Sequence, residues 1–372
     1  SQFFFYPYLR DDAPPVEPVP LNAFPKAFYF DTMGQTFMRS GVTPEDTYAL
    51  FTCGGDGLTH AHLDALSFTI YKHGFQAMDT GNRPPRADDN HWAYATSTAA
   101  HNSLLIHMPD EPTPPGNWVM KMESYTGPQR NFGGQAETSG SRVVAFETNE
   151  HYAYVAGDAT RTYREDKVHL ASRQFLFLPP DVFVVYDRIV PVKASYKTEW
   201  LLHTATAPQR LPGSTDTFQA THQQGRIVVQ TLLPHDSSAE VREGFQWSDG
   251  TTMPIAAWDA LSPEVQLMQG KWTLGVSSDK ARRIVEYLHV MRVQKADAPL
   301  PAFSADLMKT ATTSGVTLKV EDRTYEILFN RVREIGGSVT IVGPEGEQIS
   351  SGPLATSIEA QSMLAPEPLR DE

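Results

Sequence analysis

The chain has 372 residues, of which 40% are hydrophobic and 20% charged, and it is long enough to bury a globular core without disulfide support. Its formal net charge of −13 excludes a broad basic footprint for nucleic acid, so any anionic ligand must be held by a local cluster of cations or by a metal. The single cysteine, Cys53, excludes an intrachain disulfide, and no run approaches the roughly 20 apolar residues that span a membrane.

The first 27 residues do not resemble the start of a folded domain. The chain begins with Ser1, and no charged segment leads into an apolar run, so the sequence shows no secretory signal. Residues 11–25 contain five prolines, which is typical of a stiff, extended linker. We therefore expect residues 1–27 to be a linker that follows a preceding domain, and the chain to be part of a longer protein.

From Phe28 onward, glycine and proline separate short runs that are rich in β-branched and aromatic residues. Such runs predict strands joined by turns, and no segment has a long, strong helical period. The clearest runs are residues 68–71, 143–146, 175–178, 182–186, 226–230, 316–320 and 338–342. We predict an all-β fold, with a large antiparallel β-sandwich over residues 28–300. After a break near residues 296–301, a smaller β-sheet domain is expected over residues 301–372.

The segment that carries chemistry lies around residue 60, where His60, His62 and Asp64 alternate. If this segment is a strand, the three side chains share one face. Asp79 and His101 follow at distances that would let neighbouring strands bring them to His62. Two imidazoles and a carboxylate are a common zinc ligand set, although a pair of alternating histidines alone is equally consistent with ordinary exposed or core residues.

Several stretches, which occur in the family's order over roughly residues 30–205, resemble the C-terminal domain of heparinase II/III-like polysaccharide lyases. They are residues 37–41 (FMRSG), 46–49 (DTYA), 60–64 (HAHLD), 79–81 (DTG), 100–103 (AHNS), 154–159 (YVAGDA) and 181–188 (DVFVVYDR). The resemblance implies that His62, Asp79 and His101 hold one zinc ion. It also implies that His60 faces the substrate cleft and takes part in catalysis, while Asp64 orients an imidazole.

The resemblance further implies a missing N-terminal (α/α) toroid, which would supply a catalytic tyrosine, and whose remnant would be residues 1–27. The zinc is expected to be structural, although three protein ligands usually indicate an open catalytic site. The expected activity is β-elimination on a uronate-containing polysaccharide, in the bacterial periplasm or outside the cell, with a homodimer as the assembly if the chain self-associates. No nucleic-acid or membrane partner is expected.

Four further residues near this segment are candidates for binding the substrate: Arg83, Arg86, His91 and Tyr94. Arg83 and Arg86 stand in a proline-containing loop, where a guanidinium can pair with a carboxylate or sulfate, or can simply be solvated. Two other functions compete with the lyase. One is a non-catalytic carbohydrate-binding β-sandwich. The other is a zinc hydrolase, for which the sequence offers no HExxH-like helix.

Overall fold

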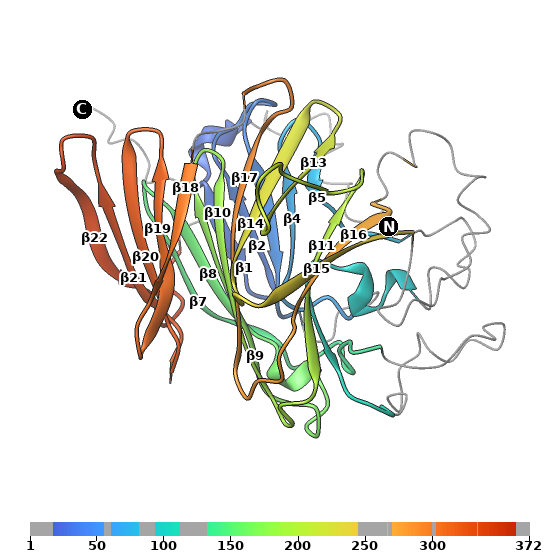
Figure 1. The fold of residues 1–372 in the computed structure, drawn as a ribbon. Coiled ribbons are helices and arrows are strands. Elements are labelled where there is room, and N and C mark those ends of the chain that lie inside the picture. Colours follow the sequence, from blue (N-terminus) through green and yellow to red (C-terminus); the bar gives the residue numbers. More distant parts are fainter. Residues whose placement is uncertain are drawn as a thin grey trace, which may run out of the picture.

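The computed structural model describes residues 18–55, 61–81, 94–111, 132–244, 266, 270–299, 303–332 and 334–361. Within these ranges the chain is almost entirely β-structure, and every pairing between named strands is antiparallel (Figure 1). None of the helices in the described ranges is long and apolar enough to cross a membrane.

The strands form four sheets, each named here by its place in the chain. The N-terminal sheet is a meander of β1 (Ala27–Phe30), β2 (Gln35–Arg39), β3 (Tyr48–Thr52), β4 (Ser67–Tyr71) and β5 (Phe75–Ala77). The four-stranded sheet has the order β15 (Ser237–Glu243), β16 (Trp272–Ser278), β11 (Lys197–Thr204) and β6 (Leu104–His107). The eight-stranded sheet has the order β12 (Gln209–Arg210), β13 (Thr217–His222), β14 (Gly225–Leu233), β17 (Val285–Lys295), β10 (Val182–Pro191), β9 (Val168–Leu178), β8 (Ala153–Asp158) and β7 (Arg142–Thr148). The C-terminal sheet is a meander of β18 (Phe303–Lys309), β19 (Thr313–Val320), β20 (Arg323–Asn330), β21 (Gly337–Val342) and β22 (Gln348–Leu354).

One face of the eight-stranded sheet packs against the N-terminal and four-stranded sheets together. This first core contains large buried side chains from all three sheets, among them Phe51, Phe68, Trp200 and Phe175. Strands β9 and β10 of the eight-stranded sheet are buried on both faces, which explains why their sequences are nearly continuous apolar runs. The result is the large antiparallel sandwich that the sequence predicts.

The C-terminal sheet covers the other face of the eight-stranded sheet and forms a second core with it, so the molecule has three layers (Figure 1). A polar contact reinforces this junction at Glu286 on β17. Its carboxylate accepts hydrogen bonds from Tyr186, Ser314, Lys309 and Arg331, with donor–acceptor distances of 2.6–2.9 Å. The smaller sheet is therefore closely attached to the sandwich.

The prediction of strands is confirmed for all seven runs singled out in the sequence, which lie in β4, β7, β9, β10, β14, β19 and β21. The predicted break near residues 296–301 falls between the end of β17 and the start of β18. The division of the chain at residue 300 into two domains remains a prediction, and most of the expected linker over residues 1–27 lies outside the described residues.

Candidate metal centre

Three segments from different parts of the chain bring His62, Asp79 and His101 together. His62 lies in the irregular segment before β4, and Asp79 directly follows β5 and Met78. His101 ends a single turn of 3₁₀ helix, η4 (Thr98–Ala100). One ligand atom from each side chain lies within 4.8 Å of the other two. The sequence prediction that these residues meet therefore agrees with their placement.

The route by which they meet differs from the prediction. The sequence suggested a strand with His60, His62 and Asp64 on one face, but the described part of this segment, residues 61–66, is not a strand. The amide of Leu63 donates to the Thr96 carbonyl, and the amide of Ala65 donates to the Gln135 side chain. Leu66 then adopts a positive φ of 68°. These long-range partners replace a strand ladder and fix the segment as a loop.

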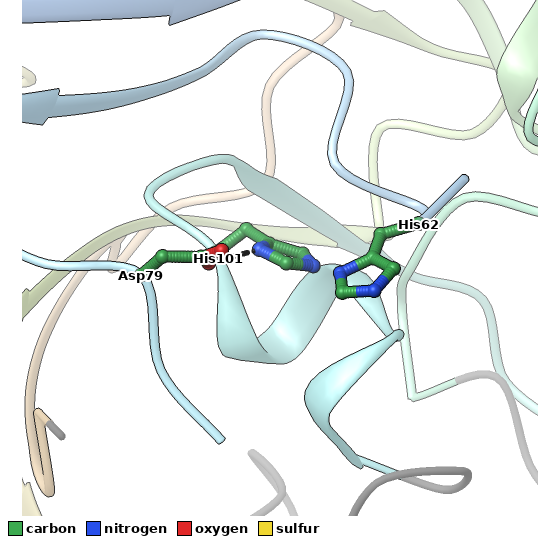
Figure 2. Close-up of side chains that lie close together, drawn as sticks. All are labelled: His62, Asp79 and His101. Atoms are coloured by element: carbon green, nitrogen blue, oxygen red, sulfur yellow. Dashed lines mark hydrogen bonds and ion pairs between the residues drawn. The ribbon is translucent and has the colours of Figure 1, made fainter. Parts of the chain in front are cut away.

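His101 occupies the middle of the cluster, between Asp79 and His62 (Figure 2). Its Nδ1 donates to Asp79 Oδ1 at 2.5 Å, and its ring lies 5.4 Å from the ring of His62, centroid to centroid. The His101 side chain is 1% exposed, whereas that of Asp79 is 53% exposed. The exposed side of the carboxylate thus leaves the cluster open to solvent from one direction.

The interaction between Asp79 and His101 shifts the pKa values of both side chains. Desolvation by itself would raise the pKa of Asp79, but the charge and hydrogen bond of His101 outweigh it and lower the pKa below its usual value. Burial would lower the pKa of His101, but the carboxylate of Asp79 reverses this and raises it. The pair therefore favours a carboxylate next to an imidazole with a proton on Nδ1.

The second ring nitrogen of His101 is independent support for a metal ion at this cluster. Within the described part of the chain, the buried Nε2 atom of His101 has no hydrogen-bond partner, and it points toward His62 (Figure 2). A buried nitrogen without a partner costs about 1–3 kcal/mol, which a metal ligand bond would offset. Tetrahedral zinc with ligand bonds of about 2.0–2.1 Å holds its ligand atoms roughly 3.3 Å apart, so the three groups need close by only about 1.5 Å or less.

The Asp79–His101 contact offers two ways to hold such an ion. In the first, His62, Asp79 and His101 would all be direct ligands. In the second, His62 and His101 would be ligands, and the Asp79 carboxylate would orient the His101 ring through the hydrogen bond at Nδ1, as carboxylate–histidine–zinc triads do. Both arrangements use the three residues that the sequence singled out.

Two further predicted residues lie inside the described part of the chain. Burial raises the pKa of Asp64 to about 6, with the charge of His101 opposing the shift and that of Asp79 adding to it, so Asp64 is coupled to the cluster. Tyr94 is 1% exposed, and burial raises its pKa to about 12. Its hydroxyl lies 3.3 Å from Thr80 Oγ1 and donates to the Ala99 carbonyl at 3.3 Å. The Tyr94 hydroxyl therefore contacts residues beside the cluster, and its predicted role in substrate binding remains a prediction.

The remaining predicted residues, His60, Arg83, Arg86 and His91, lie outside the described residues. Their roles in catalysis and substrate binding therefore remain predictions. His60 is nevertheless only two positions from His62 in the chain.

Asn102, the neighbour of His101, connects the backbones of the cluster, and the sequence analysis gave it no role. Its side-chain amide donates to the carbonyls of Phe68 and Met78, at 2.7 and 2.9 Å, and its Oδ1 accepts from the amide of His203 at 2.7 Å. Met78 is adjacent to Asp79. The sequence feature that could have indicated a role for Asn102 is its position in the AHNS stretch, next to the candidate ligand His101.

The family model for the heparinase II/III-like C-terminal domain matches residues 24–271, which is more than half of the chain. The chain belongs to this heparinase II/III-like family. A search of the curated proteins found no match.

Solved structures similar to this heparinase II/III-like chain include lyases. Heparan sulfate lyase HepC from Pedobacter heparinus shares 14% sequence identity at a TM-score of 0.57, over 83% of this chain and 43% of its own. Two structures of heparinase III share 15% and 13% identity at TM-scores of 0.55 and 0.54, each over 82% of this chain and 42% of its own. At these identities the likeness establishes the fold, and the chain spans less than half of the length of each of these proteins.

Proposed function

We propose that this chain supplies the metal-bearing half of a polysaccharide lyase, which cleaves a uronate-containing polymer by β-elimination. One observation carries the proposal: a chain of the heparinase II/III-like family gathers His62, Asp79 and His101 into one cluster, with a buried imidazole nitrogen directed at its centre. The names of the similar structures, heparan sulfate lyase and heparinase III, support a uronate polymer as the substrate class.

The reaction breaks the C4–O bond of the uronate after removal of the proton at C5. A base takes that proton, the electron pair forms the C4–C5 double bond, and an acid protonates the leaving oxygen, each transfer contributing about 10²–10⁴-fold. Charge that develops on the uronate carboxylate must be stabilised by a cation or a hydrogen-bond donor. We assign this proton-transfer or carboxylate-neutralising role to His60, since an imidazole titrates near neutral pH.

His62, Asp79 and His101 are proposed to hold one zinc ion. When bound, the ion would fix His62, two positions from His60 in the chain, and would add positive charge near the uronate carboxylate. Asp64 would keep the histidines oriented, and Arg83, Arg86 and His91 would contact the acidic sugar. An N-terminal toroid of the same enzyme would supply the tyrosine, and the site of action would be the bacterial periplasm or the extracellular space.

The test is to follow the ultraviolet absorbance of the unsaturated uronate product. The full-length protein should be assayed with heparan sulfate, hyaluronan, alginate and ulvan, alongside this chain alone. We expect product from at least one polymer with the full-length protein, and little or none with the chain alone. Absence of product from every uronate polymer by a folded, zinc-loaded full-length protein would refute the lyase assignment.

A non-catalytic carbohydrate-binding function is the second candidate, and a pocket of about 430 Å³ on the N-terminal sheet favours it. Aromatic rings line this pocket, namely Phe24, Phe28, Phe30, Phe37 and Tyr48. Sugar sites, however, combine such rings with placed polar groups, and this pocket is almost wholly apolar. Binding of a polymer without any unsaturated product would select this function over the lyase.

A further inference from the structure

A buried ion pair stands behind the metal centre, on the eight-stranded sheet. Arg173 on β9 faces Asp187 on β10, and the two residues are direct cross-strand partners. The guanidinium binds the carboxylate through two hydrogen bonds, Nε to Oδ1 at 2.6 Å and Nη2 to Oδ2 at 3.1 Å. Both side chains are 0% exposed. A buried pair of this kind gives little net stability compared with apolar packing, so its contacts deserve a functional explanation.

The third nitrogen of the guanidinium, Nη1, is directed across the sandwich to the candidate metal centre. Nη1 of Arg173 donates to the backbone carbonyls of Leu66 and Asn102, at 2.5 and 2.6 Å. Leu66 ends the loop that carries His62 and Asp64, and Asn102 is the neighbour of His101. The guanidinium also lies over the ring of Phe68, 5.3 Å from its centroid. One side chain thus ties together two of the three segments that form the cluster.

The third segment is tied to the same point through Asn102. Its side chain donates to the carbonyl of Met78, which precedes Asp79, while its own carbonyl is held by Arg173. The carbonyl of Leu66 belongs to a residue with a φ of 68°, a backbone conformation that costs a side-chain-bearing residue energy and needs surrounding support. The amide of Leu66 donates to the Thr52 carbonyl of β3, and the contact from Arg173 supports the residue at its carbonyl.

We propose that Arg173, anchored by Asp187, is a positioning residue of the metal centre, holding the His62 and His101 segments at the separation that an ion requires. The inference rests on the proposed zinc site but not on the lyase activity. A lysine at position 173 would keep the charge but cannot bind a carboxylate through two nitrogens and reach two carbonyls with a third. The arrangement therefore depends on the forked shape of the guanidinium as well as on its charge.

The experiment is to measure zinc affinity of the 372-residue chain by competition with a chromogenic chelator. We expect Arg173→Lys to weaken zinc binding by about 10–100-fold, the usual effect of losing a group that orients metal ligands. Asp187→Asn, which leaves Arg173 in place with a neutral partner, should shift the affinity in the same direction by less. The visible spectrum of Co²⁺ bound in place of zinc should also change in Arg173→Lys, because that spectrum reports ligand geometry.

The matched control is Glu286→Gln, which removes a charge from another buried polar network at the opposite face of the eight-stranded sheet. It should lower the melting temperature but leave zinc affinity and the Co²⁺ spectrum unchanged. Folding of every variant is checked by circular dichroism, and Asp187→Asn provides the answer if Arg173→Lys does not fold.

Unchanged zinc affinity in the folded variants of both Arg173 and Asp187 would overturn the inference, as would an equal loss in Glu286→Gln. A wild-type chain that binds no zinc would overturn it together with the proposed metal site. A full-length protein that binds zinc normally but forms no unsaturated product would refute only the proposed lyase activity.

Discussion

Replacing His62 by alanine tests the metal centre most directly. The substitution removes one of the three proposed ligands, and it should leave the fold of the apo chain nearly intact because His62 is partly exposed and lies in a loop. Zinc at 100 times its dissociation constant stabilises the folded state by about 2.7 kcal/mol. At about 2–4 °C per kcal/mol for chains somewhat smaller than this one, the zinc-loaded wild type should melt roughly 5–10 °C above the chelated form.

In His62→Ala this difference should largely disappear, while the two chelated proteins should differ by less than about 1 kcal/mol. Scanning calorimetry with zinc and with a chelator gives the melting temperatures, and elemental analysis gives the bound metal. His169→Ala is the control, since His169 is an exposed histidine on β9 away from the cluster. The reasoning fails if His62→Ala keeps stoichiometric zinc and the full thermal shift.

Three other perturbations probe the catalytic, supporting and structural residues. In the full-length enzyme, His60→Ala should lower turnover about 10²-fold or more while zinc stays bound, and loss of the metal would contradict this division of roles. Tyr94→Phe should cost about 1 kcal/mol of stability with little change in KM, whereas a large rise in KM at unchanged stability would support the predicted substrate contact. Glu286→Gln should cost about 3 kcal/mol at pH 7, measured by denaturant unfolding. Burial alone would raise the pKa of Glu286, but the hydrogen bonds from Arg331 and the other donors lower it from 4.5 to about 2. The contribution of the Glu286 carboxylate to the free energy of unfolding is therefore present above pH 4.5 and is lost as pH falls toward 2. An equal difference from wild type at pH 7 and pH 3 would contradict that assignment.

The sandwich could be predicted from the sequence because its strands carry their own local signal. Each predicted run combines β-branched and aromatic residues with flanking turns, and the deeply buried runs in β9 and β10 need no alternation, since both of their faces are covered. The layering of the sheets could not be predicted in the same way. It depends on which faces meet, as in the second core between the eight-stranded and C-terminal sheets.

That His62, Asp79 and His101 lie close together could be predicted from the sequence, but the shape of the backbone that carries them could not. The alternation of His60, His62 and Asp64 would produce a strand only if the backbone N–H and C=O groups of this segment paired with those of a neighbouring strand. In the structure those groups are taken by Thr96 and by the side chain of Gln135, which are far away in the sequence. A local pattern holds no information about such partners.

The ion pair behind the cluster did leave a signal in the sequence. Arg173 and Asp187 interrupt the apolar runs of two strands that one turn connects. Both lie at the same distance from that turn, since Leu178 pairs with Val182 beside the turn and Arg173 pairs with Asp187 further along. Opposite charges at matching positions of a buried hairpin predict a cross-strand pair. What the sequence could not show is the further reach of the guanidinium to Leu66 and Asn102.

Side chains from the strands of the eight-stranded sheet hold the loops of this site in place, which explains how the site can be rigid without regular secondary structure of its own. The loop before β4 has carbonyls, such as that of Leu66, that face the interior and have no strand to bind, and an apolar neighbour would leave them without a donor. A guanidinium supplies donors in several directions at once, but it is tolerated in the core only beside a carboxylate, which Asp187 provides. Asp79 then orients His101 from the solvent side, while Arg173 holds the adjacent carbonyl from the interior. The imidazole of His101 is thus restrained from both sides, and we expect zinc binding to move mainly His62.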